Sequence, residues 1–288
     1  MDKNMDRGNQ GGREGRPQST PESRPQRDPG SSPEHALDMG AGTDAGSDAE
    51  AVVAGATGMP GLNAAAPEVF AAARTRRSIR AYRPDPVPPA LLRDIVELGR
   101  HAPSGSNLQP WRVHVLTGAT LLRVGGAIKA AFLSGEPGHR RDYDYYTDPV
   151  FEPYLGRRRA CGWGLYGTLG IGKGDHDQSR AYRARNYEFF GAPAGLVFTI
   201  DRRLEKGSWL DYGMFLQTIM LAARARGLHS CAEASIASYP DIVRRELGLG
   251  PEWVVICGMA MGYADEANVV NRFQPERIPL DDYASFHD

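Results

Sequence analysis

The sequence predicts an α+β fold in which helices flank one central, mostly antiparallel sheet. The segments apolar enough to form strands are few, at 112–116, 195–200 and 253–261, and helical patterns outnumber them. A doubly wound nucleotide-binding fold would need more strands alternating with helices. The chain has 288 residues, of which 41% are hydrophobic, so it can bury a sizeable core.

Residues 1–60 differ in composition from the rest of the chain. Residues 1–50 are rich in Gly, Pro, Asp, Glu, Arg, Ser and Gln and have almost no large apolar side chains. Such a segment cannot bury enough surface to offset the entropy lost on ordering. We therefore predict a disordered tail at 1–60, solvated or used for docking or targeting, and a folded domain over 61–288.

Turn residues and apolar spacing predict the elements at the start of this domain. A short helix at 68–73 leads into a cluster of arginines, and prolines between 84 and 89 hold an extended connector. Pro89 suits the first turn of the next helix, whose apolar stripe spans 91–98, and Pro103 ends it. The segment 112–116 alternates in polarity and is predicted to be a strand.

The second half of the chain is predicted to be mainly helical. Helices are expected at 121–132, 178–190, 209–225 and 241–247. Gly227 is the expected C-cap of the helix at 209–225. That helix is apolar nearly all round, which predicts burial on all sides, either at the domain centre or in an oligomer interface.

Residues 135–175 are predicted to form an irregular insertion. The segment is aromatic and basic, and it is too long for an ordinary connection, which is typical of a functional lid or insertion. A solvated basic loop is an equally simple interpretation.

Composition excludes several classes of function. The net charge is -1 and the sequence pI about 6.7, which disfavours a nucleic-acid partner. The three cysteines form no CxxC pair, which indicates neither a disulfide framework nor a zinc site, and no other pattern indicates a metal. No apolar run reaches the ~18 residues of a membrane helix, and no signal-peptide core follows the N-terminus. We therefore expect a cytoplasmic protein without a membrane partner.

The segment from Arg76 to Arg80 places three guanidiniums and one hydroxyl within five residues. A phosphate monoester needs several hydrogen bonds and about two positive charges, which arginine supplies in a planar fork. In an extended segment, Ser78 and Arg80 would share one face. The alternative is a solvated basic turn after a helix.

The segment 103–111 is a second candidate wall of a binding site. Asn107 and Gln109 each carry a donor and an acceptor, which suits the edge of a heterocycle, and Ser104 and Gly105 allow close backbone approach. The alternative is a simple turn with Trp111 in the core. Together the two segments indicate a large ligand that is anionic at one end and flat at the other.

These residues resemble a known family. The stretch "RRSIRAYRPDPVP…HAPSGSNLQPWRV" resembles the opening of the FMN-dependent nitroreductases, and "NRFQPERIPLDDY" resembles their C-terminal segment. "GLHSCAEASIASYPDIVRRELGL" lies between them in the expected order, so the resemblance covers roughly residues 67–283. It implies a nitroreductase-like fold and an intertwined homodimer with two FMN sites at the subunit interface.

The resemblance also implies the cofactor-binding residues. Arg76, Arg77, Ser78 and Arg80 would hold the FMN phosphate, ribityl chain and pyrimidine edge, with Arg277 completing the phosphate site. Pro103, Ser104, Gly105, Asn107 and Gln109 would come from the other subunit. Ser235, Ile236 and Ala237 would lie beside the flavin ring. Many family members have a glutamate-glycine pair in that last segment, and this sequence departs from it.

The implied activity is ping-pong transfer of a hydride from NAD(P)H through FMN to an electron-poor acceptor, a nitroaromatic compound or a quinone. No side chain is then expected to act as an essential acid or base, because the flavin carries the chemistry. The stretches "FEPYLGRRRACGWGLYGTLGI" and "ARNYEFFGAP" resemble the nitroaromatic-reducing subgroup.

Within the insertion, aromatic side chains could stack on a flat acceptor, and the arginines at 157–159 could attract a carboxylate or a cofactor phosphate. The candidate substrate residues are Tyr154, Arg157, Trp163 and Tyr166. The alternatives are a flavin enzyme of the same fold with other chemistry, such as a dehalogenase or an ene- or quinone reductase, and a non-catalytic flavin-binding module.

Overall fold

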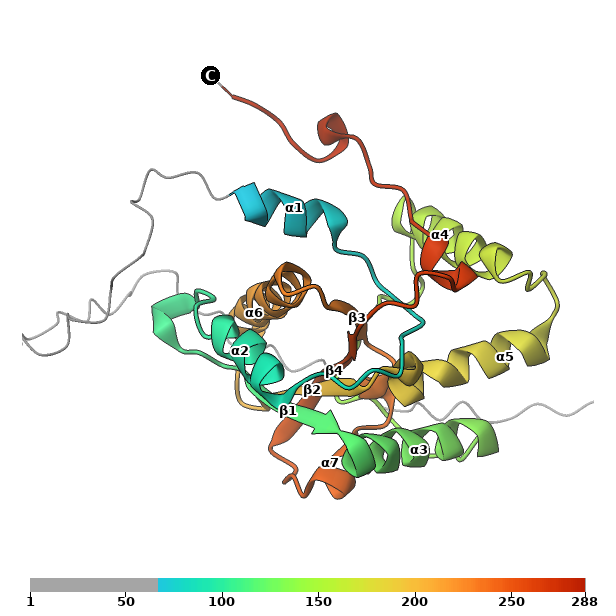
Figure 1. Cartoon of the computed structure of the whole chain (residues 1–288), viewed down its shortest axis with the longest axis horizontal. Coiled ribbons are helices and arrows are strands. Elements are labelled where there is room, and N and C mark those ends of the chain that lie inside the picture. Colours follow the sequence, from blue (N-terminus) through green and yellow to red (C-terminus); the bar gives the residue numbers. More distant parts are fainter. Residues whose placement is uncertain (1–66, 288) are drawn as a thin grey trace, which may run out of the picture. The chain divides into compact units, whose positions relative to one another are not determined.

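The structure is a computed structural model that describes residues 67–287, so the tail predicted at 1–60 lies outside the described residues. Its sheet has four strands in the order β1-β2-β4-β3, and all neighbours are antiparallel, which confirms the α+β prediction (Figure 1). The strands are β1 (Arg112–Thr117), β2 (Ala194–Asp201), β3 (His229–Glu233) and β4 (Trp253–Gly262).

The predicted helices are present, with small changes at their ends. They are α1 (Pro67–Thr75), α2 (Pro89–Gly99), α3 (Gly118–Ser134), α5 (His176–Ala184), α6 (Lys206–Ala225) and α7 (Pro240–Leu247). The helix expected at 178–190 is shorter than predicted, because a 3-10 segment, η2 (Arg185–Gly191), replaces its second half. Gly227 follows α6 with a φ of 78°, as its predicted capping role requires.

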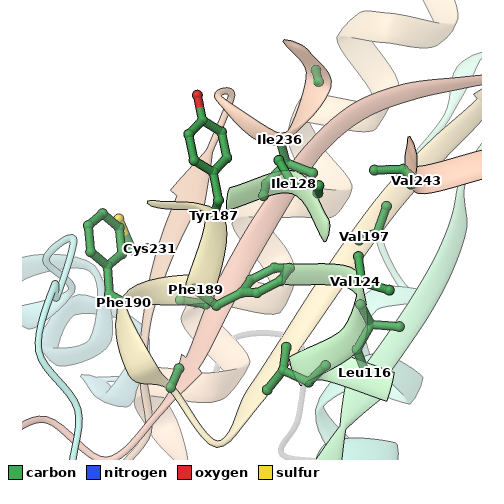
Figure 2. Close-up of a cluster of buried hydrophobic side chains, with 14 of the residues drawn as sticks. Leu116, Val124, Ile128, Tyr187, Phe189, Phe190, Val197, Cys231, Ile236 and Val243 are labelled. Carbon is green, nitrogen blue, oxygen red and sulfur yellow. The ribbon is translucent and has the colours of Figure 1, made fainter. Parts of the chain in front are cut away.

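Two hydrophobic clusters lie on opposite faces of the sheet, as the alternation of side chains along a strand requires. On β2, Val197 belongs to the first cluster, whereas Leu196 and Phe198 belong to the second. The first cluster is closed by α3, η2 and α7, and the second by α2 and α6 (Figure 1). Figure 2 shows side chains of the first cluster, among them Phe189 and Val197.

Strand β3 was not predicted from the sequence. Its five residues contain no β-branched side chain, and the strand forms because Cys231 pairs with Ala260 and its neighbours pair along β4. It lies at one edge of the sheet, and β1 lies at the other.

The prediction that residues 135–175 are irregular is wrong in part. The segment contains a helix, α4 (Tyr154–Thr168), which packs on the C-terminal segment. Gly164 allows this contact, because a Cβ there would lie 2.7 Å from the ring of Phe273. The start of the segment is also anchored, since Asp142 accepts hydrogen bonds from Arg202 at 2.9 Å and Arg244 at 2.7 Å.

Helix α6 is buried on one face only within a single chain. Tyr212, Phe215 and Ile219 face the core, whereas Leu210 is 72% exposed. Gly213 and Gln217 continue the exposed stripe at helical spacing. Burial on all sides is therefore not reached in one chain, so the interpretation that places α6 at the domain centre is wrong, and the oligomer interface stays a prediction. No helix among residues 67–287 has the length and apolarity to cross a membrane.

Candidate functional site

The arginine segment, residues 76–82, extends the sheet at the free edge of β3. Ser78 forms a parallel bridge with Ser230, and the Ile79 N–H donates to the Ser230 carbonyl at 3.2 Å. Ile79 is buried, Ser78 is exposed and Arg80 is half-buried. The segment is therefore extended, and it fixes its backbone to the sheet while Ser78 and Arg80 stay accessible.

Asn271 holds this segment from the other side. Its amide oxygen accepts from the Arg80 N–H at 2.9 Å, and its amide nitrogen donates to the carbonyls of Ala81 and Asp265, each at 2.8 Å. Asn271 is 7% exposed, so these bonds are shielded from water. Sequence reasoning missed this role, although Asn271 begins the C-terminal motif that carried the resemblance.

Strand β3 and the turn after it present polar side-chain atoms that lack hydrogen-bond partners among the described residues. These buried atoms are His229 Nδ1, Ser230 Oγ, both carboxyl oxygens of Glu233, and Ser235 Oγ. Unpaired buried groups are costly and are usually satisfied by a ligand, an ion or water. Because several such groups gather beside the arginine segment, this edge of the sheet is the candidate site.

The predicted ring-contacting residues differ in what they can offer. Ser235 is half-buried with a free hydroxyl. The side chains of Ile236 and Ala237 are fully buried and belong to the first hydrophobic cluster. These two residues can therefore reach a ligand only through their backbone.

The second predicted wall, residues 103–109, is an ordered loop docked on α6. The Gly105 N–H donates to the buried Asp211 carboxylate at 3.1 Å, and the Gln109 N–H donates to Ser104 Oγ at 3.0 Å. Asn107 is exposed and has a φ of 56°, a conformation that asparagine tolerates better than most residues. Pro103 is also exposed.

Trp111, which follows this loop, belongs to the core. Its ring stacks on Phe215 with centroids 4.7 Å apart and planes 4° from parallel. The interpretation of Trp111 as a core residue is therefore confirmed, while the amides of Asn107 and Gln109 stay at the surface.

The two walls do not meet within one chain. The arginine segment follows Thr75, whose hydroxyl accepts a hydrogen bond from Arg224 near the end of α6, whereas Gly105 docks at Asp211 near its start. These contacts are thirteen positions apart on the helix, which corresponds to about 20 Å along its axis. The two segments also lie towards opposite edges of the sheet, beside β3 and before β1.

The four predicted substrate residues all lie on α4, in different surroundings. Trp163 and Tyr166 line a cavity of about 900 Å³ together with Arg158, Arg159 and Lys173. Its walls thus combine aromatic and cationic side chains.

On another side of α4, Arg157 and Arg277 line a cavity of about 640 Å³ that also includes the half-buried Cys161. Arg277 donates to the carbonyls of Pro275 and Glu276 in its own segment. Among residues 67–287, the hydrogen bonds of Arg277 do not reach Arg76 or Arg80, so its place at the phosphate stays a prediction. The Arg157 guanidinium lies 5.7 Å from the ring of Tyr154.

Tyr182 of α5 connects α4 with the arginine segment. Its ring lies 6.1 Å from that of Tyr166, and its hydroxyl is buried without a partner among the described residues. Burial raises the pKa of Tyr182 to about 12, and the positive charge of Arg80 opposes this shift. Tyr182 is therefore a neutral phenol whose buried hydroxyl has no partner among the described residues.

Buried acidic groups beside the arginine segment are held neutral. Burial raises the pKa of the Glu233 carboxyl well above its usual range, and the charge of Arg80 only partly opposes this effect. Burial likewise raises the pKa of the Cys231 thiol to about 12. No group of three or more His, Cys, Asp or Glu side chains able to hold a metal occurs in residues 67–287.

The fold and the candidate site define a class of protein: an α+β domain with an arginine-rich segment and unpaired polar groups at one edge of its antiparallel sheet. The sequence model of the nitroreductase family matches residues 73–263. The chain belongs to the nitroreductase family.

Three similar proteins illustrate this relationship. The chain is 38% identical over 213 residues to a chloronitrobenzene nitroreductase of Comamonas testosteroni, covering 74% of this chain and 94% of the relative. It is 38% identical over 214 residues to a 4-nitrobenzoate reductase of Pseudomonas putida, covering 74% and 92%. The structure of the FMN-dependent nitroreductase NfnB from Mycobacterium smegmatis in complex with NADPH superposes with a TM-score of 0.73 at 34% identity, covering 77% of this chain and 99% of that one.

Proposed function

We propose that this protein is an FMN-dependent, NADPH-oxidising reductase of nitroaromatic compounds that works as a homodimer. The observation that carries the proposal is the arginine segment fixed beside unpaired polar groups of β3. Relatives that the match covers to 94% and 92% of their length are named as reductases of chloronitrobenzene and 4-nitrobenzoate, and a structural neighbour is named as FMN-dependent and in complex with NADPH.

The residues present fit FMN. Arg76, Arg77 and Arg80 supply three positive charges, more than the two that neutralise a phosphate monoester, and Ser78 adds an exposed hydroxyl. Unpaired Ser230 and Ser235 offer hydrogen bonds to a ribityl chain or a ring edge. Arg277 joins the phosphate site in this proposal. The second wall consists of Pro103, Ser104, Gly105, Asn107 and Gln109.

The second wall comes from the partner subunit in this proposal. Within one chain the walls dock about 20 Å apart on α6. The uncovered stripe of α6 at Leu210 supports a partner, and so does Leu108, which is 60% exposed within the second wall. Pairing two chains through these surfaces would bury Leu210 and Leu108. It would also place the 103–109 loop of each chain against the arginine segment of the other.

Bound FMN would supply the chemistry, by accepting a hydride from NADPH and passing electrons to the nitro group. The protein binds and orients the participants. Arg76 and Arg80 neutralise anionic charge, and the buried Ile79 keeps the segment in place.

Selection of the acceptor is assigned to α4. Trp163 and Tyr166 would stack on an aromatic ring in the 900 Å³ cavity, where Arg158 and Arg159 favour an anionic substituent such as a carboxylate. Arg157, with Tyr154 beneath its guanidinium, would attract the same anions on the neighbouring side. We also propose a cytoplasmic location, which the three free cysteines support.

The proposal is tested with the purified full-length protein. We expect FMN-like absorbance, and NADPH oxidation that requires added 4-nitrobenzoate or nitrobenzene. The Arg76→Ala, Arg80→Ala double variant is the matched control and should take up less FMN. Failure of the wild type to bind FMN, or NADPH oxidation that no nitroaromatic compound accelerates, would refute the proposal.

A further inference from the structure

One face of α4 forms a wall of the cavity of about 900 Å³. Leu155, Arg159, Trp163 and Tyr166 follow one another three or four positions apart, and all of them line it. Arg158 lines the same cavity and lies five positions before Trp163, which corresponds to about 7.5 Å along the helix axis. These two side chains can therefore flank a single substituted benzene ring.

The charges that line this cavity are all positive. Arg158, Arg159 and Lys173 contribute cations, and the described residues that line it include no aspartate or glutamate. His176 adds a group that becomes cationic when it is protonated. The cavity is therefore suited to a ligand that carries negative charge as well as an aromatic ring.

Arg158 contacts an aromatic ring, whereas other arginines of this chain are tied to acids. Its guanidinium carbon lies 4.6 Å from the centroid of the Tyr146 ring. Arg244, by contrast, forms an ion pair with Asp142 at 2.7 Å. A carboxylate partner occupies the N–H groups and cancels the charge, but an aromatic ring takes only the face of the guanidinium. The contact with Tyr146 thus orients Arg158 and leaves its in-plane N–H groups and its charge for an anion.

The Tyr146 ring belongs to a run of aromatic contacts that reaches the core of the domain. It packs edge-on against Tyr145, with centroids 4.6 Å apart, and Tyr145 lies 6.3 Å from Tyr143. Tyr143 packs against Trp209 of α6 at 4.7 Å, and its hydroxyl donates to the Ile256 carbonyl on β4. These tyrosines of the insertion therefore connect the cavity wall with the sheet.

We propose that Tyr146 is a positioning residue that makes the enzyme select nitroaromatic compounds with an anionic substituent, because it holds the guanidinium of Arg158 at the cavity wall. This inference rests on the proposed function and deepens it by naming the residue pair that sets the substrate preference. The substrate ring packs on Trp163, and its carboxylate accepts in-plane hydrogen bonds from Arg158. Both residues act on binding, so their loss raises KM and leaves kcat unchanged.

The first measurement compares 4-nitrobenzoate with 4-nitrobenzamide, which has nearly the same shape and no charge. In the wild type the KM for the acid should be at least about fivefold lower. Arg158→Gln should raise the KM for the acid about tenfold and leave that for the amide within about twofold. Arg140→Gln is the matched control, because it removes an exposed positive charge of the same insertion outside the cavity lining. Equal KM values for the two substrates in the wild type, or equal effects of Arg158→Gln and Arg140→Gln, would overturn the proposal.

The role of Tyr146 is tested with two substitutions at that position. Tyr146→Leu should raise the KM for 4-nitrobenzoate about threefold, the range for one exposed cation–π contact. Tyr146→Phe keeps the ring and should restore the wild-type KM. Tyr146 is 54% exposed, so neither change opens a cavity in the core. An equal loss in both variants, or a KM for 4-nitrobenzamide that rises by the same factor in Tyr146→Leu, would show that Tyr146 does not act through the charge of Arg158.

The second measurement is binding without turnover, by calorimetric titration of 4-nitrobenzoate into the oxidised, FMN-loaded protein without NADPH. The Kd should rise in Arg158→Gln and in Tyr146→Leu by the same factors as KM. Added salt should weaken binding to the wild type more than binding to Arg158→Gln, because it screens the ion pair. The same Kd and the same salt dependence in all three proteins would overturn the proposal.

The two levels of failure are distinguishable. A wild-type protein that binds no FMN or reduces neither substrate refutes the proposed function and this inference together. A wild-type protein that reduces both substrates, with a preference that Arg158→Gln and Tyr146→Leu leave unchanged, refutes only the roles of Arg158 and Tyr146.

Discussion

Replacing Asn271 with alanine should destabilise the domain and weaken FMN binding together. The Asn271 side chain makes three hydrogen bonds, which fix both Arg80 and Ala81 to the turn at Asp265. At about 1 kcal/mol each, their loss predicts a decrease of about 3 kcal/mol in the free energy of unfolding. For a domain of this size, that corresponds to a Tm lower by roughly 6–12 °C.

The matched control is Asn268→Ala in the same turn. Asn268 is half-buried, and its side chain accepts one hydrogen bond, from the Val270 N–H at 3.2 Å. Its loss should cost only about 1 kcal/mol and should leave FMN affinity unchanged, because it does not touch the arginine segment.

The assay is thermal unfolding at matched protein concentration, because Tm depends on concentration in a dimer, followed by FMN titration. We expect the Kd of Asn271→Ala to rise about tenfold, since the guanidinium of Arg80 loses its fixed backbone. Equal destabilisation by Asn271→Ala and Asn268→Ala, or an unchanged Kd in Asn271→Ala, would refute the reasoning.

Three further predictions concern cofactor, dimer and substrate. Arg76→Ala and Arg80→Ala should each raise the Kd for FMN about tenfold or more, because each removes a charge-assisted contact to the anionic ligand. Unchanged affinity in both variants would show that these arginines do not bind FMN. Leu210→Asp should yield monomers by analytical ultracentrifugation, whereas Leu122→Asp, at a side chain 75% exposed on α3, should leave the dimer intact. A dimeric Leu210→Asp protein would exclude this face of α6 as the dimer interface. Trp163→Ala should raise KM for nitroaromatic compounds about tenfold with unchanged FMN affinity; an unchanged KM would place the acceptor elsewhere.

The sequence predicted most of the fold because most elements carry local signals. Prolines and apolar stripes predicted α2, and the long apolar runs predicted β2 and β4. Strand β3 was missed because its residues have low strand propensity and depend on pairing with β4. Helix α4 was missed because its glycines and arginines give no apolar stripe.

The candidate site was only partly accessible to sequence reasoning. The motif at 76–80 predicted an anion site, since arginine chemistry is local. The contribution of Asn271 depends on a hydrogen bond across 191 positions, which no local pattern reveals. The unpaired state of Glu233 likewise depends on what surrounds it in space.

The central claim is that each FMN site combines the arginine segment of one chain with the 103–109 loop of its partner. Two variants each damage one wall: Arg80→Ala, and Gly105→Leu. At Gly105 an added Cβ would meet only Asp211 Oδ2, at an ordinary 3.8 Å, so this second variant should fold. Each variant alone should bind FMN poorly.

The decisive measurement is FMN bound after the two variants are unfolded together in equal amounts and refolded. A shared site predicts recovery of about a quarter of the wild-type FMN, because about half the dimers are mixed and each mixed dimer has one site built from two intact walls. A site built within one chain predicts no recovery, because every chain then carries a damaged wall. FMN content no higher than in the separate variants, with mixed dimers present, would contradict the account.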